Sequence, residues 1–289
     1  SKAKEELGRM LFFEPLLSGG ATRSCASCHN PGLSWGDGLA RAIGEKPLPL
    51  RSPTLYNMAW SQILGWDGKF RSLESVTFAP ITSPANMNRR EEDLLGALAV
   101  IPGYRQLFAR AFPDDPRPNR ENIEAALATF ERTLVSAATP FDRWIEGDET
   151  AISEAAKRGF DIFNGKAECA ECHKGWNFTD GSFHDIGTAT GDDIGRGRLF
   201  PTSVKLRYAF KVPTLRDVSR RAPYMHDGSE PTLEAVIDLY DRGGIDRPSR
   251  SELIKPLRLS LQEKADLIAF LTTLTGERSE EHTSELQSH

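Results

Sequence analysis

Two short cysteine–histidine segments carry the clearest chemistry in this sequence. In the first, His29 directly follows the pair Cys25 and Cys28. Two thiols at this spacing bind the two vinyl groups of one porphyrin, and the adjacent imidazole then gives the iron an axial nitrogen. The second segment has the same spacing, with Cys169, Cys172 and His173. The two segments therefore predict two covalent haem c groups with one proximal histidine each.

Two other interpretations of the four cysteines stay open at this point. Both Cys-x-x-Cys pairs together could hold zinc, or each could be a thioredoxin-like redox pair. However, a zinc site needs no histidine after each pair, and no β-α-β pattern surrounds either of them. Covalent haem attachment also implies a mature protein outside the cytoplasm, so we expect a periplasmic protein whose export signal lies outside this sequence.

The haem-binding segments belong to a longer internal repeat. Amphipathic segments at residues 7–13 and 156–163 precede them, and Pro-Thr-Leu follows them at Pro53 and Pro213. From this triplet onward, Asp-Gly and Leu-Glu pairs recur at an offset of 160 residues, whereas the cysteines recur at 144. The second copy therefore carries about 16 extra residues, in a Gly- and Asp-rich loop at residues 177–206. Two such copies predict two tandem domains of like fold.

The strand signal is weak throughout, so we expect a mainly α fold with two tandem cytochrome c-like domains, long loops and little β structure. The domains are expected at residues 1–142 and 143–277, with one haem each. A helix at residues 122–138 should end before a proline, and a capping box should start another at residues 260–275. The tail at residues 278–289 resembles a translated sequencing adaptor and is excluded as an artefact.

The composition excludes several classes of protein. The 289 residues are 39% hydrophobic and 27% charged, which is typical of a folded globular chain. The net charge of −5 argues against nucleic acid as a partner, and no apolar run approaches the ~20 residues of a membrane span.

The repeat also suggests what lies at the sixth position of each iron. Trp66 in the first copy aligns with His226 in the second, and Pro80 aligns with Tyr240. If position 240 faces the second iron, Tyr240 can ligate it, whereas Pro80 cannot ligate the first. One haem would then be capped and pass electrons, and the other would be open to peroxide or oxygen. A phenolate ligand favours ferric and higher states; the alternative for Tyr240 is a buried helix aromatic.

The sequence resembles the bacterial di-haem cytochrome c peroxidase and MauG family over residues 7–275. The resemblance implies that the first haem reacts with peroxide and that Trp66 lies between the two haems. It implies a calcium ion near Asn57 and the backbone carbonyls of Arg221 and Pro223. Tyr240 stands where ordinary peroxidases have methionine, as in MauG-like, including MbnH-like, members. The matching segments include LSGGATRSCASCHNP, SPTLYN, WDGKFRSLE, CAECH and KVPTLRDVSRRAPYMHDG.

Three departures from the family pattern affect the expected chemistry. Val76 and Asn86 stand where ordinary peroxidases and MauG have Gln and Glu over the open haem, although Pro80 matches the family's distal proline. Asn86 can hydrogen-bond peroxide but cannot transfer its proton at neutral pH. Ala167 replaces a tryptophan that MauG has before its second haem segment, so the electron route to a protein substrate should differ.

Three functions are therefore considered. The first is a peroxidase-type di-haem oxidoreductase in which hydrogen peroxide generates a high-valent di-haem state, with Trp66, Pro80, Asn86 and Tyr240 at the reacting centre. That state would oxidise a tryptophan or tyrosine of a periplasmic partner protein. The alternative is a cytochrome c peroxidase that reduces peroxide to water with electrons from a small c-type cytochrome. The third is a non-catalytic electron carrier or sensor.

Four other features are interpreted more cautiously. His184 should hydrogen-bond rather than ligate iron, and Met225 should pack. Trp176 is a core or interface residue with an alternative role as an electron relay. The basic residues could pair with haem propionates or simply be solvated; they are Arg216, Arg220 and Arg221.

Overall fold

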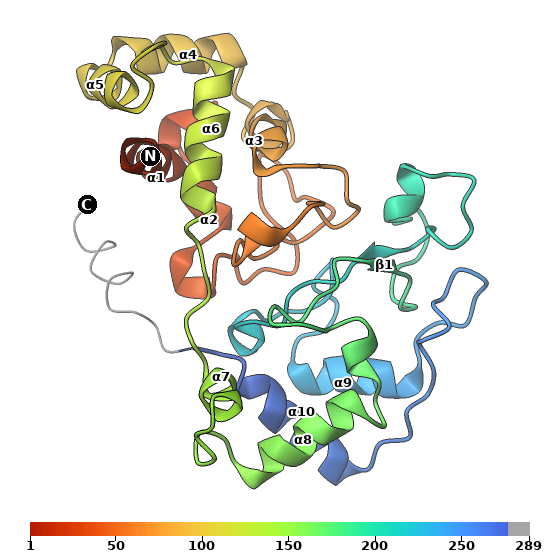
Figure 1. Cartoon of the computed structure of the whole chain (residues 1–289). Helices are drawn as coiled ribbons and strands as arrows, with labels where there is room; N and C mark the ends of the chain where they lie inside the picture. The colour runs from red at the N-terminus through yellow and green to blue at the C-terminus, as the bar shows by residue number, and fades with distance from the viewer. Residues whose placement is uncertain (277–289) are drawn as a thin grey trace. The chain divides into compact units, whose positions relative to one another are not determined.

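The computed structural model describes residues 1–276 and contains helices, short 3-10 turns and one two-stranded sheet (Figure 1). This confirms the predicted mainly α fold with little β structure. The chain divides into two compact units, residues 1–64 with 70–135, and residues 65–69 with those from 136 onward. The domain limits expected from the sequence stay a prediction, and the excluded tail lies outside the described residues. None of the described helices is long and apolar enough to cross a membrane.

The first unit is built around the crossing of its first and last helices, α1 and α6. The bounds of its helices are α1 Lys2–Phe12, α2 Cys25–Cys28, α3 Leu73–Thr82, α4 Glu91–Val100, α5 Pro102–Ala111 and α6 Arg120–Glu131. Between α1 and α6 the backbones nearly touch, because a Cβ on Gly8 would lie 2.0 Å from the carbonyl oxygen of Ala126. Fully buried Leu7, Leu11 and Phe12 of α1 pack in the core that this crossing creates.

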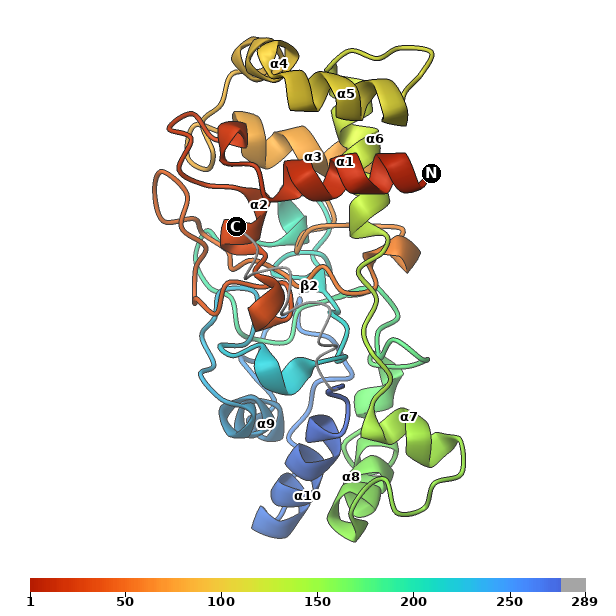
Figure 2. The same cartoon turned by 90° about the vertical axis from the view of Figure 1, so that its left-hand side faces the viewer.

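The second unit repeats the same crossing with α8 and α10, which lie side by side in both views (Figures 1 and 2). The helices of this unit are α7 Pro140–Ile145, α8 Glu154–Asn164, α9 Leu233–Arg242 and α10 Leu261–Thr272. A Cβ on Gly159 would lie 1.9 Å from the carbonyl oxygen of Asp266, so this glycine matches Gly8. The predicted capping box at the start of α10 is present, with Ser260 and Glu263.

The inserted loop of the second unit contributes strand β1 to the only sheet among the described residues. Strands β1 (Phe183–His184) and β2 (Phe210–Lys211) pair antiparallel, with Phe183 opposite Lys211. An isolated bridge between Gly195 and Ala209 holds the rest of the insertion to the same segment.

One helix ends earlier than the sequence predicts. The helix expected at residues 122–138 ends as α6 at Glu131. A turn at residues 132–133 follows it, and the carbonyl of Leu134 accepts a hydrogen bond from the backbone N–H of Asn57 at 2.8 Å. This bond to a distant loop competes with helical pairing, which local propensity cannot reveal.

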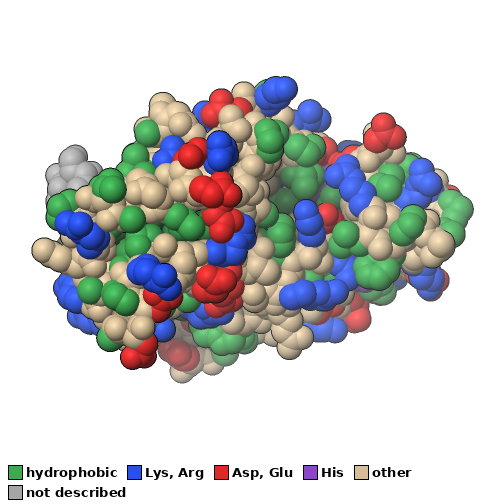
Figure 3. Space-filling view, turned by 90° about the horizontal axis from the view of Figure 1, so that it is seen from above, with side chains coloured by type: hydrophobic (Ala, Val, Ile, Leu, Met, Phe, Trp, Pro, Cys, Tyr) green, Lys and Arg blue, Asp and Glu red, His purple; other side chains and the backbone are tan. Residues whose placement is uncertain are grey.

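Neither acidic nor basic side chains dominate the face of the molecule drawn in Figure 3. Acidic and basic side chains are interspersed there with hydrophobic ones. This agrees with the modest net charge of −5.

Candidate di-haem site

The first haem-binding segment forms one helical turn, α2. Ser24 and Ser27 cap this turn reciprocally, and the N–H of His29 donates to the carbonyl of Cys25 at 2.9 Å. Cys25 and Cys28 therefore lie one turn apart on a short, fixed support. This is the spacing at which two thiols reach the two vinyl groups of one porphyrin.

A backbone carbonyl fixes the proton on the His29 ring. Nδ1 of His29 lies 3.1 Å from the carbonyl oxygen of Trp35, and a carbonyl can only accept. Nδ1 therefore carries the hydrogen and Nε2 keeps its lone pair, which is the arrangement of a neutral imidazole that ligates a metal. Burial lowers the pKa of His29, which keeps this neutral form dominant at neutral pH.

The second segment reproduces this geometry. Its cysteines belong to a 3-10 turn, Cys169–Glu171, and Nδ1 of His173 lies 3.0 Å from the carbonyl oxygen of Phe178. Trp35 and Phe178 both have left-handed backbone, with φ of 60° and 49°. Such φ values are strained for aromatic residues. Their recurrence at matching places indicates that the strain serves to hold the carbonyl against the proximal histidine.

The four thiols fit covalent haem better than the alternatives. All four are free. Burial raises the pKa of Cys25 and Cys169 to about 12 and that of Cys172 to about 11, so none resembles an activated redox thiol. Over residues 1–276 no group of three or more His, Cys, Asp or Glu side chains that could hold a metal ion is found. These cysteines and histidines fit one thioether-bound haem in each unit.

Tyr240 lies close to the second haem segment. It is the eighth residue of α9, and its pKa is raised, first by burial and then by the neighbouring thiols of Cys169 and Cys172. The electrostatic effect of these thiols indicates that Tyr240 lies near the second haem segment, and its role as an iron ligand stays a prediction.

The matching position in the first unit has no ligating atom. Pro80 lies inside α3, and its carbonyl accepts a hydrogen bond from the N–H of Met87 at 3.2 Å. This bond folds the loop that carries Asn86 back onto the end of α3. Asn86 is fixed from the other side, since its carbonyl accepts from the N–H of Glu45 at 2.9 Å. Val76 packs in a small apolar cluster instead of facing this loop with a polar group.

Trp66 belongs by its packing to the second unit, in the turn of residues 65–69. Its carbonyl accepts a hydrogen bond from the N–H of Lys211 at 2.8 Å. The matching turn of the second copy carries His226, whose Nε2 lies 2.7 Å from Oδ2 of Asp193. The two turns share their local form, since Gly68 and Gly228 have φ of 72° and 70°.

The residues expected to bind calcium lie in different units. Asn57 is fully buried in the first unit and has a left-handed φ of 62°. In the second unit, Arg221 and Pro223 follow a 3-10 turn, and Nη2 of Arg221 donates to the carbonyl of Thr214 at 2.5 Å. Calcium therefore stays a prediction.

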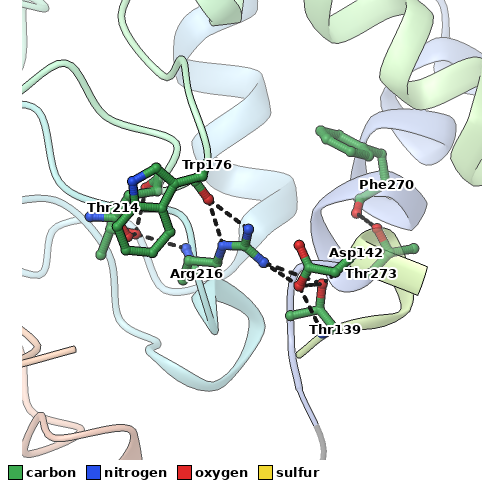
Figure 4. A network of polar contacts seen from close by, with 8 residues as sticks. Thr139, Asp142, Trp176, Thr214, Arg216, Phe270 and Thr273 are labelled. Carbon is green, nitrogen blue, oxygen red and sulfur yellow. Dashed lines mark hydrogen bonds and ion pairs between the residues drawn. The ribbon is translucent and has the colours of Figure 1, made fainter. Parts of the chain in front are cut away.

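A buried arginine anchors the chain beyond the second haem segment (Figure 4). Arg216 donates from Nε and Nη2 to the carbonyl of Trp176, at 2.8 and 2.6 Å, and from Nη1 to Asp142 at 2.6 Å. Burial alone would raise the pKa of Asp142, but hydrogen bonds from Arg216 and Thr139 lower it. Arg216 is thus buried and bound to protein groups, which corrects the idea that it is solvated; pairing of this basic cluster with a haem propionate stays a prediction.

Other residues considered from the sequence have local roles. His184 hydrogen-bonds the hydroxyls of Ser182 and Ser251, at 2.8 and 3.2 Å, as expected. The Trp176 side chain is 51% exposed, and Ala167 is buried in the core of the second unit.

Sequence reasoning missed three residues near these sites. The carbonyls of Trp35 and Phe178 could have been found, because an aromatic residue follows each proximal histidine at nearly the same distance. Glu131, a buried carboxyl near Cys25, left no signal, because it reads as an ordinary helix residue.

Comparison with known proteins agrees with this arrangement. The family model described as di-haem cytochrome c peroxidase matches residues 2–150. The methylamine utilization protein MauG of Methylorubrum extorquens is 52% identical over 277 residues, covering 95% of this chain and 78% of that protein. The cytochrome c551 peroxidase of Nitrosomonas europaea is 33% identical over 279 residues, covering 94% and 80%. The crystal structure of a MauG-like protein associated with microbial copper homeostasis is 32% identical with a TM-score of 0.89, covering 96% and 90%.

A mainly helical chain with a Cys-x-x-Cys-His haem site in each of two repeated units defines a di-haem c-type protein. The chain belongs to the di-haem cytochrome c peroxidase and MauG family. It is an oxidoreductase of the peroxidase type, with two haem c groups.

Proposed function

We propose that this protein uses hydrogen peroxide to oxidise a tryptophan or tyrosine side chain of a periplasmic partner protein. When bound, the haems supply the redox chemistry, in which peroxide takes up two electrons and two protons to give two water molecules. The partner side chain supplies these two electrons and releases two protons, so the reaction balances. The observation that carries this proposal is the position of Tyr240 beside Cys169 and Cys172.

The two units offer different surroundings to their haems. Pro80 brings no ligating atom to the first site, which leaves room there for peroxide. Asn86, fixed beside Pro80 by the loop of Glu45, can donate its amide hydrogen to a bound peroxide but cannot supply a proton. Proton delivery therefore falls to water or to another group, which disfavours rapid peroxide turnover.

In the second unit His173 and Tyr240 would hold the haem iron. An anionic phenolate stabilises oxidised iron and thereby helps the unit to hold oxidising equivalents. Trp66, whose turn packs in this unit, would carry electrons between the haems. A calcium ion at Asn57, Arg221 and Pro223 belongs to this proposal as a structural ion.

The variant Tyr240→Met tests the proposal, with Leu239→Met as a matched control on the same helix. Electron paramagnetic resonance of the diferric protein should show a change of the second haem's ligands in Tyr240→Met only. Peroxide-driven oxidation of tryptophan or tyrosine in added protein should be lost in Tyr240→Met only. Sustained oxidation of a reduced small c-type cytochrome by the unaltered protein would instead favour an ordinary cytochrome c peroxidase.

A chelator tests the calcium ion separately. Removal of calcium from the holoprotein should change the haem absorption spectrum, and added calcium should restore it. Absence of bound calcium in elemental analysis of the purified holoprotein would contradict this part of the proposal.

A further inference from the structure

The inserted segment of the second unit, residues 177–206, holds the turn that carries Trp66. Arg196 of this segment is buried, and its Nη1 donates to the carbonyls of Asp67 and Gly68 at 2.8 and 3.2 Å. The N–H of Lys211 donates to the carbonyl of Trp66. The carbonyls of residues 66–68 therefore all accept hydrogen bonds from Arg196 or Lys211. The backbone of Trp66 is therefore fixed by residues that lie more than a hundred positions away in the sequence.

The guanidinium of Arg196 is itself held in place. Its central carbon lies 4.0 Å from the ring centroid of Phe183 and 4.9 Å from that of Phe200. The packing leaves no room for a side chain at position 68, since a Cβ on Gly68 would lie 2.2 Å from Nη1 of Arg196. A planar, stacked cation with donors in fixed directions is a firm support for a turn.

The same segment also contacts the matching turn of the second copy. Asp193, three residues before Arg196, binds the ring of His226, and Phe210 stacks on that ring at 3.6 Å between centroids. The neighbouring Lys211 binds the carbonyl of Trp66. Strand β2 thus touches the turn of Trp66 with one residue and the turn of His226 with the other. The inserted segment therefore contacts both turns, through Arg196 and Asp193, and these turns occupy equivalent positions in the two copies of the repeat.

We propose that Arg196 is a positioning residue for the Trp66 indole, and that the inserted segment serves to hold this indole in a fixed geometry for electron transfer. The inference rests on the proposed function insofar as Trp66 carries electrons between the haems. Arg196 acts through the backbone of Asp67 and Gly68. Its loss should therefore loosen the turn without removing a haem ligand.

Two variants and one control separate this role from a general effect on folding. Arg196→Gln removes the charge and the stacked plane, whereas Arg196→Lys keeps the charge but loses the fixed fork of donors. Arg198→Gln is the matched control, because Arg198 lies in the same 3-10 turn, is half-exposed and binds within its own loop, to the carbonyl of Asp192 at 3.1 Å and to the carboxylate of Asp193 at 3.9 Å. Haem content by absorbance should be equal in all four proteins.

The first measurement is hydrogen–deuterium exchange of the holoprotein. The N–H groups of Gly68 and Lys69 bond to Gly65 and Asp67 within the turn. Loss of the Arg196 bonds should accelerate exchange of these amides by about tenfold or more in Arg196→Gln. Arg196→Lys should give a smaller increase and Arg198→Gln none. Exchange in Arg196→Gln equal to that of the unaltered protein would overturn the proposal.

The second measurement is the rate at which an electron equilibrates between the haems after flash reduction of the diferric protein by a photoexcited dye. This rate should fall about tenfold or more in Arg196→Gln and be kept in Arg198→Gln. Faster amide exchange with an unchanged equilibration rate would make Arg196 merely structural and would overturn the proposal. Because this assay needs no peroxide, it tests Arg196 even if the protein fails to oxidise a partner.

Discussion

Glu131 offers a test of how the first unit is built, because it is a carboxyl buried in an apolar core. It closes α6, its side chain is close to Cys25, and its Oε2 has no hydrogen-bond partner. Burial raises the pKa of Glu131 to about 8. The positive charge of Arg132 lowers this pKa and the negative charge of Glu74 raises it, but both effects are smaller than that of burial. At neutral pH this carboxyl is therefore mostly protonated in the folded protein.

The sign of the pH effect follows from this raised pKa. Between about pH 4.5 and pH 8 the folded state keeps the Glu131 proton while the unfolded chain releases it, so the free energy of unfolding falls as pH rises. At about 1.4 kcal/mol per pH unit, this loss amounts to about 5 kcal/mol above pH 8. Below about pH 4.5 the group makes no such contribution.

The variant Glu131→Gln should remove this loss because its side chain stays neutral. A buried amide needs partners of its own, which costs about 1–3 kcal/mol. The variant should therefore be close to the unaltered protein in stability at pH 5.5 and more stable at pH 8.5 by about 2–4 kcal/mol. Guanidinium chloride unfolding of the holoprotein, followed by circular dichroism at both pH values, measures this difference.

Glu74→Gln is the matched control on the neighbouring helix α3. A hydrogen bond from Arg132 lowers the pKa of Glu74, so this variant should lose stability, by less than about 1 kcal/mol because the pair is partly exposed. Parallel pH profiles of the unaltered protein and Glu131→Gln would refute the reasoning about Glu131.

Three further predictions follow from packing and attachment. Gly8→Ala should destabilise the protein by about 3 kcal/mol or more in chemical unfolding, because its Cβ would meet the carbonyl of Ala126. Its control Gly96→Ala, whose Cβ would meet nothing within 4 Å, should stabilise the protein by about 0.5–1 kcal/mol. Equal changes in the free energy of unfolding would contradict the close contact between α1 and α6. Arg216→Met removes the cation beside Asp142, to which Thr139 still donates, and should cost about 1–3 kcal/mol because Asp142 is partly exposed. A thermal midpoint equal to that of the unaltered protein would argue against the network of Figure 4. Changing both Cys25 and Cys28 to Ser should leave one covalent haem instead of two by intact-mass spectrometry, and retention of both would disprove the first attachment site.

The sequence predicts the parts of this fold that depend on local pattern. Both Cys-x-x-Cys-His segments, the start of α10 at Ser260 and the equivalence of Pro80 with Tyr240 follow from spacing alone. Each is set within a few residues of chain, where side-chain type and helical period decide the structure.

The remaining features depend on contacts between distant residues. The early end of α6 at Glu131 is accompanied by a hydrogen bond from Asn57 to the carbonyl of Leu134. The turn that carries Trp66 is held by hydrogen bonds from Arg196. No periodicity connects such pairs. The burial of Glu131 is equally hidden, because a glutamate on a helix is usually solvated.

The measurement that tests the central claim most directly is the visible and near-infrared spectrum of the diferric holoprotein before and after one equivalent of peroxide. We expect a new near-infrared band without prior reduction, because in the proposed function Tyr240 would stabilise oxidised iron at the second site and Trp66 would carry electrons between the haems. The band should be absent in Tyr240→Met. A spectrum that changes only after half-reduction of the protein, or does not change at all, would contradict the proposed function.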